Sequence, residues 1–383
     1  MTTTNKLQIS VLGAGLVGFP MALDLSKDQQ FDVTLCDIRK ERLDQINKKY
    51  GIRTVLADLS DAATVRSLVS KADLVVSAVP GFLGFQTLKI IIEEGKNVVD
   101  IAFFPEDLFE LEELALKKGV IAISDIGVAP GMSNMLTAYG SRLLDKTEKV
   151  RIFVGGLPKK RQLPFEYRAP FSPIDVIEEY TRPARFIRDG KLVEMPALSE
   201  PEYLEFEELG TLEAFNSDGL RSLIRTIDCP DMIEKTLRYP GHIGKIKLLQ
   251  EIGYFSTETI NIKGQIVRPI DLTTQLLFPL WELKDEHDVT VMLIMVEGTK
   301  DNRKMRYTWE LADEFDAATG IHSMARTTGY TATAAVRLIS SGSYKRKGIS
   351  PPEYIGFEPA CVDFMLKDLA KRNVIYREKI ETL

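Results

Sequence analysis

The chain has few cysteines and no long apolar run, and each scarcity excludes a class of protein. Its 383 residues include three cysteines, Cys36, Cys229 and Cys361, which lie far apart and form no C-x-x-C pair. A disulfide framework or a structural zinc site is therefore not expected. No stretch reaches the roughly 20 consecutive apolar residues that cross a bilayer, and the polar first residues lack the apolar core of a signal peptide. We expect a soluble, cytoplasmic protein with no metal and no membrane partner.

An excess of positive charge is also absent. Lysine and arginine number 49 against 55 aspartates and glutamates, which gives a formal net charge of −6. Such a chain has no basic field to hold a phosphate backbone, so nucleic acid is not an expected partner. Apolar residues are plentiful at 44%. A chain of this length exceeds what one hydrophobic core normally supports, so two domains are expected.

Short β-rich apolar runs alternate with helical patterns in the first third of the chain. The expected strands are 7–12, 32–37, 53–58, 73–79, 97–101 and 120–125. The expected helices between them are 19–25, 39–49, 62–70, 85–94 and 105–118. This alternation predicts an α/β fold, a Rossmann doubly wound parallel sheet of six strands.

The alternation stops near residue 151, which indicates a second domain. Strand patterns there are expected at 151–154, 184–188, 192–195, 203–206 and 289–296, with helices at 218–226 and 243–252. They predict an α+β domain built on a largely antiparallel sheet. An apolar helix at 329–341 is expected to pack back on the first domain, and another helix is expected at 362–372. We place the three segments at 1–135, 136–325 and 326–383.

A glycine motif stands between the first expected strand and the first expected helix. Glycine at these positions allows a tight turn, lets backbone approach a pyrophosphate and permits close packing of helix on strand. The amide groups at the helix start would hold the phosphates. The expected cofactor contacts are Gly13, Ala14, Gly15, Leu16, Val17 and Gly18.

Asp37 ends the next strand, 19 residues after the last glycine of the motif. A carboxylate there accepts hydrogen bonds from the adenosine ribose and repels a 2′-phosphate, so NAD is favoured over NADP. Arg39 leaves the choice open, because an arginine can stack on adenine or meet a 2′-phosphate. Asp58 could contact the adenine edge, or it could form a helix-cap network with Ser60 and Asp61.

The carboxyl ends of the later strands are where a doubly wound sheet holds its ligand. The expected cofactor contacts at this edge are Ala78, Val79, Pro80 and Asp100. Phe104 follows the fifth strand and is expected to contact substrate. Asp125 ends the sixth strand, so Asp100 and Asp125 are both expected near the reacting atoms. A helix cap or an ion pair is the alternative for each aspartate.

Three clusters in the second domain have the character of anion sites. They place Arg182 after a pair of glutamates, Arg221 three residues after Asp218, and Arg238 four residues before His242. An arginine fork suits a carboxylate because two parallel hydrogen bonds fix its orientation. A structural ion pair is the alternative for each arginine. His242 could relay a proton near pH 7 or cap a helix.

Several of these motifs together resemble the saccharopine dehydrogenase family. The resemblance rests on Gly13 to Gly18, Pro80-Gly81-Phe82, Val98 to Ala102 and Asp125 to Ser133. A narrower likeness to the lysine 6-dehydrogenase branch rests on Val154 to Pro158, Glu178 to Arg185, Ser217 to Arg221 and Leu237 to His242. The likeness spans residues 7–255 and returns at 326–342, while 256–325 resembles nothing we can assign.

The resemblance implies oxidation of the ε-amine of L-lysine by NAD, with release of ammonia and NADH. The product is a semialdehyde that cyclises to a piperideine carboxylate. It also implies that the second domain supplies the substrate pocket and much of an oligomer interface. Ala129 departs from the related saccharopine reductases, which carry an acidic residue there and commonly use NADP. That departure argues against transferring their substrate contacts to this chain.

The expected mechanism needs an unprotonated amine, because a free lysine ε-amine has a pKa near 10.4. We expect Asp125 to be the base, with His242 as an alternative. Arg221 and Arg238 are candidates for the substrate carboxylate, with Asp218 for its α-amino group.

Two other functions compete with lysine oxidation. One is a secondary-amine oxidoreductase of the saccharopine or carboxynorspermidine dehydrogenase type, and the other is a non-catalytic NAD-binding protein. In all three cases a homodimer is expected, because an exposed sheet in the second domain would need cover.

Overall fold

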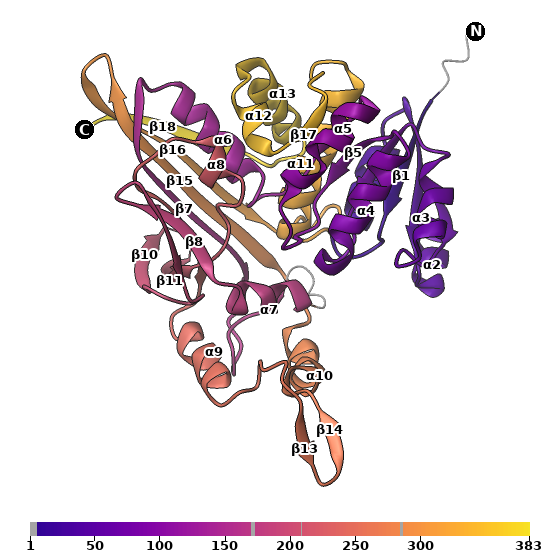
Figure 1. Ribbon diagram of the computed structural model, residues 1–383, viewed down its shortest axis with the longest axis horizontal. Coiled ribbons are helices and arrows are strands. Elements are labelled where there is room, and N and C mark those ends of the chain that lie inside the picture. Colours follow the sequence, from indigo (N-terminus) through magenta and orange to yellow (C-terminus); the bar gives the residue numbers. More distant parts are fainter. Residues whose placement is uncertain (1–5, 170–172, 208, 284–285) are drawn as a thin grey trace. The chain divides into compact units, whose positions relative to one another are not determined.

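A computed structural model describes residues 6–169, 173–207, 209–283 and 286–383 of the chain (Figure 1). The chain divides into two compact units. Unit 1 is Met1–Leu143 with Met324–Tyr376, and unit 2 is Leu144–Ser323 with Arg377–Leu383. Across the described ranges, no helix has both the length and the apolar character needed to cross a membrane.

Unit 1 is built on a parallel sheet of seven strands in the order β17-β6-β5-β4-β1-β2-β3. The strands are β1 (Leu7–Leu12), β2 (Phe31–Asp37), β3 (Arg53–Leu56), β4 (Leu74–Ser77), β5 (Asn97–Asp100), β6 (Ile121–Ile123) and β17 (Gly348–Ser350). The six strands predicted from the sequence take the order 3-2-1-4-5-6 of the Rossmann fold, which confirms the predicted fold class.

The seventh strand corrects the prediction of six. β17 comes from the C-terminal part of the chain and pairs in parallel with β6, with Ile349 opposite Ala122. All three of its residues are buried. A strand of three residues shows no alternation of apolar and polar side chains, so its sequence carries no periodic signal.

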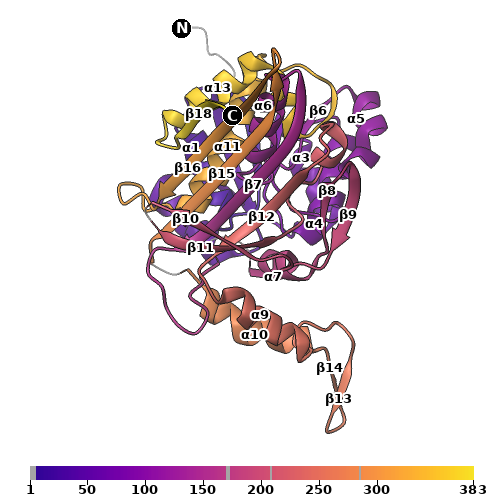
Figure 2. The same cartoon turned by 90° about the vertical axis from the view of Figure 1, so that its left-hand side faces the viewer.

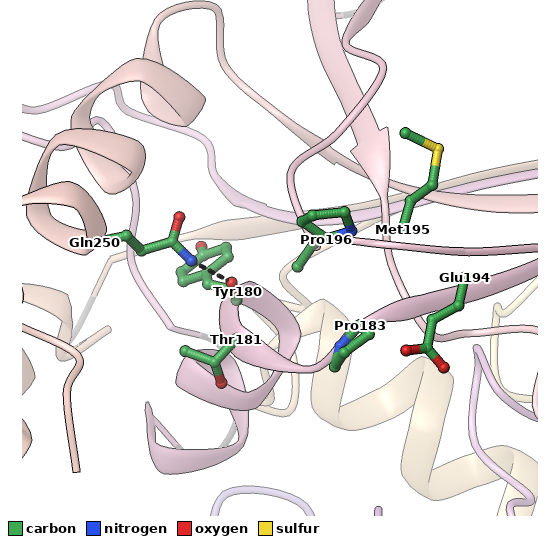
Figure 3. A pocket seen from close by; sticks show the side chains of 8 residues that line it. Tyr180, Thr181, Pro183, Glu194, Met195, Pro196 and Gln250 are labelled. Atoms are coloured by element: carbon green, nitrogen blue, oxygen red, sulfur yellow. Dashed lines mark hydrogen bonds between the residues drawn. The ribbon is translucent and has the colours of Figure 1, made fainter. Parts of the chain in front are cut away.

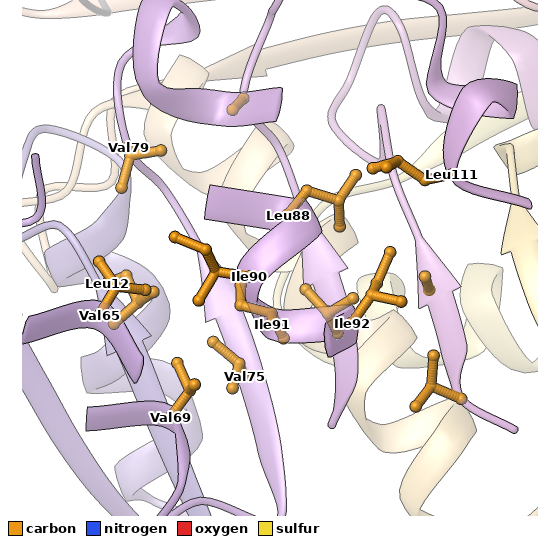
Figure 4. Close-up of a cluster of buried hydrophobic side chains, with 14 of the residues drawn as sticks. Leu12, Val65, Val69, Val75, Val79, Leu88, Ile90, Ile91, Ile92 and Leu111 are labelled. Carbon is orange, nitrogen blue, oxygen red and sulfur yellow. The ribbon is translucent and has the colours of Figure 1, made fainter. Parts of the chain in front are cut away.

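Helices and an apolar core complete unit 1. The helices are α1 (Gly18–Ser26), α2 (Lys40–Tyr50), α3 (Ala62–Val69), α4 (Gly81–Glu93), α5 (Glu112–Lys118), α6 (Met132–Arg142), α11 (Ser323–Ser340), α12 (Pro352–Gly356), α13 (Pro359–Ala370) and the 3-10 helix η1 (Leu108–Leu111). Figure 4 shows part of the core, where Val75 of β4 lies among side chains of α3 and α4. All four residues of the central strand β4 are buried, because a parallel sheet is covered on both faces.

A buried charge network joins α1 to α11 and α13. The carboxylate of Asp24 accepts from Arg337 at 2.9 Å, from Arg372 at 2.7 Å and from the Thr333 hydroxyl at 2.6 Å. Asp24 is only 4% exposed. Asp368 of α13 pairs with both arginines. This network fixes the C-terminal helices against the helix that follows the glycine motif.

Unit 2 holds a mixed sheet of nine strands. The main path runs β10-β11-β12-β7-β15-β16-β18, with β8 pairing to β12 and to β9. The strands are β7 (Lys146–Pro158), β8 (Ala184–Arg188), β9 (Lys191–Met195), β10 (Glu202–Phe206), β11 (Gly210–Asn216), β12 (Met232–Arg238), β15 (Asp288–Lys300), β16 (Arg303–Glu314) and β18 (Tyr376–Thr382). β12 and β7 pair in parallel, while β7–β15, β15–β16, β10–β11 and β11–β12 are antiparallel. β18 shows that the C-terminal tail, assigned from the sequence to helices, ends as a strand of this sheet.

The helices of unit 2 are α7 (Pro173–Thr181), α8 (Leu223–Thr226), α9 (His242–Glu251) and α10 (Pro269–Trp281), and a separate hairpin pairs β13 (Ile260–Ile262) with β14 (Gln265–Val267). The prediction of a helix over 218–226 was wrong except for its last turn. Arg221 has a positive φ of 52°, and a Cβ at Gly219 would stand 2.3 Å from the Glu234 carboxyl carbon. The segment is therefore a tight loop against β12. Figure 2 shows α9, α10 and the hairpin extending from one end of the sheet.

Candidate active site

The three glycines of the motif meet different surroundings. A Cβ at Gly13 would stand 2.5 Å from the Ala78 carbonyl oxygen, and one at Gly18 would stand 2.0 Å from the Gly13 carbonyl oxygen. Gly13 also has a φ of 102°. A Cβ at Gly15 would meet no atom within 4 Å. Packing therefore requires the outer two glycines, whereas Gly15 faces open space.

This open space lies at the start of α1, where a phosphate would be stabilised. Val17 is the N-cap of α1, and among the described residues no side chain caps that end of the helix. Leu16 is 45% exposed. The amide groups of an uncapped helix start carry partial positive charge. The loop therefore fits a dinucleotide diphosphate.

Asp37 is tied to this loop by hydrogen bonds. Its carboxylate accepts from the Ala14 amide at 2.7 Å and from the Arg39 guanidinium through two bonds of 2.8 Å each. Burial pushes the pKa of Asp37 up, but the hydrogen bonds from Arg39 and Ala14 bring it down to about 2. Arg42 donates to the Ala14 carbonyl at 3.0 Å. The loop and an ionised carboxylate thus form one rigid group, with the Arg39 side chain half exposed beside it.

Asp58 is exposed and bound locally. Its carboxylate accepts from the Ser60 amide at 2.9 Å and from the Ser60 hydroxyl at 2.6 Å. Asp61 caps α3 through the Thr64 amide. These contacts form the helix-cap network that was one of the two alternatives for Asp58. The other alternative, a contact with adenine, stays a prediction.

The end of β4 lies against the glycine motif. The Ala78 amide donates to the Leu12 carbonyl at 2.9 Å, and a Cβ at Gly18 would stand 3.2 Å from the Ala78 Cβ. Val79 is buried, and Pro80 is the N-cap of α4. The edge that was predicted to hold the cofactor is therefore continuous from β1 to β4.

Two carboxyl groups follow, one at the end of β5 and one two residues after β6. Asp100 is fully buried, and its Oδ2 accepts from the Ser124 hydroxyl at 2.9 Å. Burial, and to a lesser degree the charge of Asp125, raises the pKa of Asp100 to about 7. Asp125 is 2% exposed and has a φ of 58°. Asp100 is thus a group that changes protonation near neutral pH, as acid/base catalysis requires.

Phe104, the predicted substrate contact of this unit, is fully buried. Its ring packs edge-on against Phe85 at 5.7 Å between centroids, and a Cβ at Gly84 would stand 2.7 Å from it. The side chain belongs to the core beneath α4. Its predicted contact with substrate gains no support from this position.

Arg238 in unit 2 is also fully enclosed. Its guanidinium donates to Glu179 at 2.6 Å and to the Tyr180 hydroxyl at 3.2 Å, and it lies 4.4 Å from the centroid of the Tyr167 ring. The side chain is 2% exposed. The charge of Arg238 is therefore already balanced by Glu179. This is the structural ion pair that the sequence analysis gave as the alternative to substrate binding.

His242 continues the same network. Its Nδ1 lies 3.1 Å from the Phe165 carbonyl and its Nε2 lies 2.9 Å from the Tyr180 hydroxyl. Because a carbonyl can only accept, Nδ1 carries the proton and Tyr180 donates to Nε2. Burial, and then the charge of Arg238, lowers the pKa of His242 to about 3. The imidazole is therefore neutral near pH 7, with a partner at each nitrogen.

The remaining predicted substrate residues form a second cluster. Asp218 is paired by Arg185 through two bonds of 2.9 Å. Arg182 donates to Glu178 at 3.3 Å. Burial, and then the positive charge of Arg221, lowers the pKa of Arg182. The structure thus brings Arg182 and Arg221 close together, whereas Asp218 is held by an arginine that the sequence did not single out.

The sequence reasoning missed Glu234. This residue is 3% exposed in the middle of β12 and accepts from the Ser217 hydroxyl at 2.7 Å and from the Gly219 amide at 3.1 Å. Burial raises the pKa of Glu234 to about 8. The sequence carried no signal for it, because the strand Met-Ile-Glu-Lys-Thr-Leu-Arg is mixed in polarity and Glu234 stands 15 residues from Gly219.

A shallow pocket of about 330 Å³ opens on unit 2 (Figure 3). Its lining residues are Tyr180, Thr181, Pro183, Glu194, Met195, Pro196, Ala197 and Gln250. The Gln250 amide donates to the Tyr180 carbonyl at 2.6 Å. Tyr180 therefore separates this pocket from the Arg238 network. Within the described ranges, no group of three or more histidines, cysteines or acidic residues is arranged to hold a metal ion.

Fold and loop together define a nucleotide-binding Rossmann protein with a second mixed-sheet unit. The sequence matches two protein-family models. Residues 9–123 match the saccharopine dehydrogenase NADP binding domain, and residues 127–375 match the saccharopine dehydrogenase C-terminal domain. The chain belongs to the saccharopine dehydrogenase family, which confirms the resemblance seen in the sequence.

Curated relatives agree with this assignment. The chain is 27% identical over 272 residues to mouse mitochondrial alpha-aminoadipic semialdehyde synthase, a match that covers 67% of this chain and 29% of the mouse protein. It is 27% identical to the Schizosaccharomyces pombe saccharopine dehydrogenase [NADP(+), L-glutamate-forming], over 64% of this chain and 58% of that protein. The chain thus spans under a third of the mouse relative and just over half of the fission-yeast one.

A solved structure shares the whole fold. Apo saccharopine dehydrogenase (L-Glu forming) from Saccharomyces cerevisiae superposes with a TM-score of 0.80, covering 98% of this chain and 100% of the yeast chain, at 20% identity. The match includes both units, so the second unit is also of the saccharopine dehydrogenase fold.

Substitution of two glycines should separate binding from packing. We expect Gly15→Ala to leave the urea unfolding midpoint unchanged and to weaken NADH binding at least about tenfold, or about 1.4 kcal/mol, because the new methyl occupies the space for phosphate. Gly18→Ala should instead destabilise the fold by several kcal/mol, since its Cβ would strike a backbone carbonyl. Fluorescence titration with NADH and urea unfolding measure the two effects. Unchanged affinity in Gly15→Ala would show that the loop is not the phosphate site.

Glu234 should make stability depend on pH. The unfolded side chain ionises near pH 4.3, but the folded one does so near 8, so the folded state binds the additional proton between these values. The free energy of unfolding should therefore fall as pH rises from about 5 to 8, by on the order of 3 kcal/mol from this group. Glu234→Gln should remove that part of the slope. The exposed control Glu205→Gln should keep the full slope, and equal slopes in both variants would contradict the assignment.

Proposed function

We propose that the protein is an NAD-dependent amine oxidoreductase that oxidises the ε-carbon–nitrogen bond of lysine or of a lysine-derived secondary amine. The observation that carries the proposal is the ionised Asp37 held against the open glycine loop, in a chain of the saccharopine dehydrogenase family. A carboxylate with a pKa of about 2 is charged at every physiological pH and repels a 2′-phosphate. The fission-yeast relative is an NADP(+) enzyme, so the proposal predicts that this chain differs from it in cofactor preference.

The proposed chemistry needs a base for the amine and an acceptor for the hydride. A bound nicotinamide dinucleotide would supply the acceptor. Asp125 takes the proton from the amine, and Asp100 beside it, with a pKa of about 7, shares that proton near neutral pH. The pair can return the proton when water attacks the oxidised carbon–nitrogen bond. His242 is less suited to this role, since it is neutral and bonded at both nitrogens.

The substrate carboxylate is best assigned to Arg182 and Arg221. Arg238 is neutralised by Glu179 and Asp218 by Arg185, so binding substrate at either would first break a strong pair. Burial, and then the charge of Arg221, lowers the pKa of Arg182 although Arg182 also pairs with Glu178, and the carboxylate of a substrate beside both arginines would offset the repulsion between them.

Two substrates fit this scheme and lead to one aldehyde. With lysine, which the sequence motifs favour, the leaving amine is ammonia. With saccharopine it is glutamate, the amine formed by the L-glutamate-forming saccharopine dehydrogenases of fission yeast and budding yeast. The proximity of two arginines favours the second candidate, because the glutamyl part of saccharopine brings two further carboxylates.

A panel of amines tests the proposal. We expect absorbance of the reduced dinucleotide at 340 nm to rise with lysine or with saccharopine, and not with a carboxynorspermidine-type polyamine. Assay of ammonia and of glutamate identifies the leaving amine and so the substrate. NAD binding without turnover on any amine would favour a non-catalytic NAD-binding protein, and no binding of either dinucleotide would refute the proposal.

Replacing Asp37 should invert the choice of dinucleotide. In Asp37→Ser the negative charge is lost and Arg39 is released to meet a 2′-phosphate. We expect the ratio of kcat/KM for NAD to that for NADP to fall at least about 100-fold, or about 2.7 kcal/mol. Asp44→Ser, at an exposed site on α2, is the matched control and should keep the ratio. A wild-type protein that already prefers NADP would show that Asp37 does not select NAD.

A further inference from the structure

The carboxylate of Asp37 is the group that the proposed function assigns to the adenosine ribose, and four donors of the chain bind it. An ionised carboxylate has about four acceptor positions, two on each oxygen. Oδ2 accepts from the Ala14 amide at 2.7 Å and from Nη2 of Arg39 at 2.8 Å. Oδ1 accepts from the Arg39 amide at 2.9 Å and from Nε of the same residue at 2.8 Å. A ribose hydroxyl can therefore bind Asp37 only if one of these donors leaves.

Two of the four donors are backbone amides that the fold holds in place. Nε of Arg42 donates to the Ala14 carbonyl at 3.0 Å, which ties the glycine loop to α2 without the Arg39 side chain. Arg39 is the N-cap of α2, and its carbonyl accepts from the Leu43 amide at 3.1 Å. The backbone donors should therefore stay on Asp37 when a ligand binds.

The other two donors belong to the guanidinium of Arg39, which can turn into solvent. The Arg39 side chain is 53% exposed, so water and salt weaken its pairing with Asp37. Burial, and then the charge of Arg39, lowers the pKa of Arg42, so the two guanidinium groups repel each other. Rotation of one exposed side chain would open two acceptor positions, one on each oxygen of Asp37.

These two positions match a ribose in number and in kind. The guanidinium fork gives one hydrogen bond to each oxygen of Asp37, and the 2′- and 3′-hydroxyls of a ribose can each donate one. We propose that the ribose hydroxyls of a dinucleotide displace the guanidinium of Arg39 from Asp37, which makes Arg39 a second determinant of cofactor choice. This inference rests on the proposed function, which assigns Asp37 to that ribose.

Displacement affects the two dinucleotides differently. With NAD, the guanidinium loses its carboxylate and the ribose offers no anion in exchange, so Arg39 opposes binding. With NADP, the ribose carries a 2′-phosphate, and an arginine fork binds phosphate through two parallel hydrogen bonds. Asp37 therefore favours NAD, whereas Arg39, two residues later, favours NADP.

Replacement of Arg39 should change the two affinities in opposite directions. We expect Arg39→Ala to lower the dissociation constant of NADH at least about threefold, because the competing ion pair is gone. The same variant should raise the dissociation constant of NADPH at least about tenfold, because the donor to the 2′-phosphate is gone. Calorimetric titration of the full chain measures both constants without any amine substrate. A loss of stability or of positive charge alone would weaken the binding of both dinucleotides.

Two further variants separate the fork from the charge. Arg39→Lys keeps a positive charge but not the fork, so it should bind NADH more tightly than wild type and keep its NADPH constant within about threefold. Arg53→Ala is the matched control, because Arg53 on β3 is 60% exposed and pairs with Asp32. It should leave both dissociation constants unchanged.

Weaker binding of NADH by Arg39→Ala would overturn the inference in favour of stacking of Arg39 on adenine. An unchanged NADH constant, or a shift of both dinucleotides in one direction, would overturn it as well. Binding of NADH by the wild type separates these failures from failure of the proposed function, since no binding of either dinucleotide by any variant would refute both.

Discussion

Helix α1 is fixed at both ends, and the glycine loop depends on that constraint. At its start, Gly18 lies so close to the Gly13 carbonyl that no side chain fits between them. Near its end, the buried carboxylate of Asp24 holds Arg337 of α11 and Arg372 after α13. Removing one partner of such a buried group typically costs 3–5 kcal/mol, roughly a third of the stability of a whole domain. One carboxylate on α1 therefore connects the helix that follows the glycine turn to helices from the far end of the sequence.

The buried carboxyl groups of this protein fall into two classes, those that hold elements together and those that can exchange a proton near neutral pH. Asp24 and Asp218 are each buried and paired with arginine, so the opposite charges compensate one another and hold elements together. Asp100 and Glu234 are held by hydroxyl or amide groups instead, and the pKa of each rises to neutral pH or above. A group of the second kind exchanges its proton in the range where enzymes work. Asp100 is such a group at the carboxyl edge of the sheet, where a Rossmann fold places its ligand.

Much of unit 1 could be predicted because its signals are local. A strand, a glycine turn, a helix and an acidic residue at the end of the next strand stand in sequence within residues 7–37, and each follows from its neighbours. β17 could not be predicted, because three residues show no period. The loop at 218–222 was mistaken for a helix because it is held by Glu234, whose carboxylate accepts from the Gly219 amide across the fold. Tertiary contact overrode local preference there.

The arginines predicted to bind substrate also depend on contacts between distant parts of the sequence. Arg39 pairs with Asp37 only two positions away, yet the sequence analysis left Arg39 open between adenine and a 2′-phosphate. Arg238 meets Glu179 and Arg185 meets Asp218 across 59 and 33 positions, and only the fold reveals that these charges are taken. The sequence alone does not show whether an arginine pairs with a carboxylate of its own chain. Arg182 pairs with Glu178 four positions away, and the fold also brings the charge of Arg221 near enough to add to burial in lowering the pKa of Arg182, which the sequence does not show.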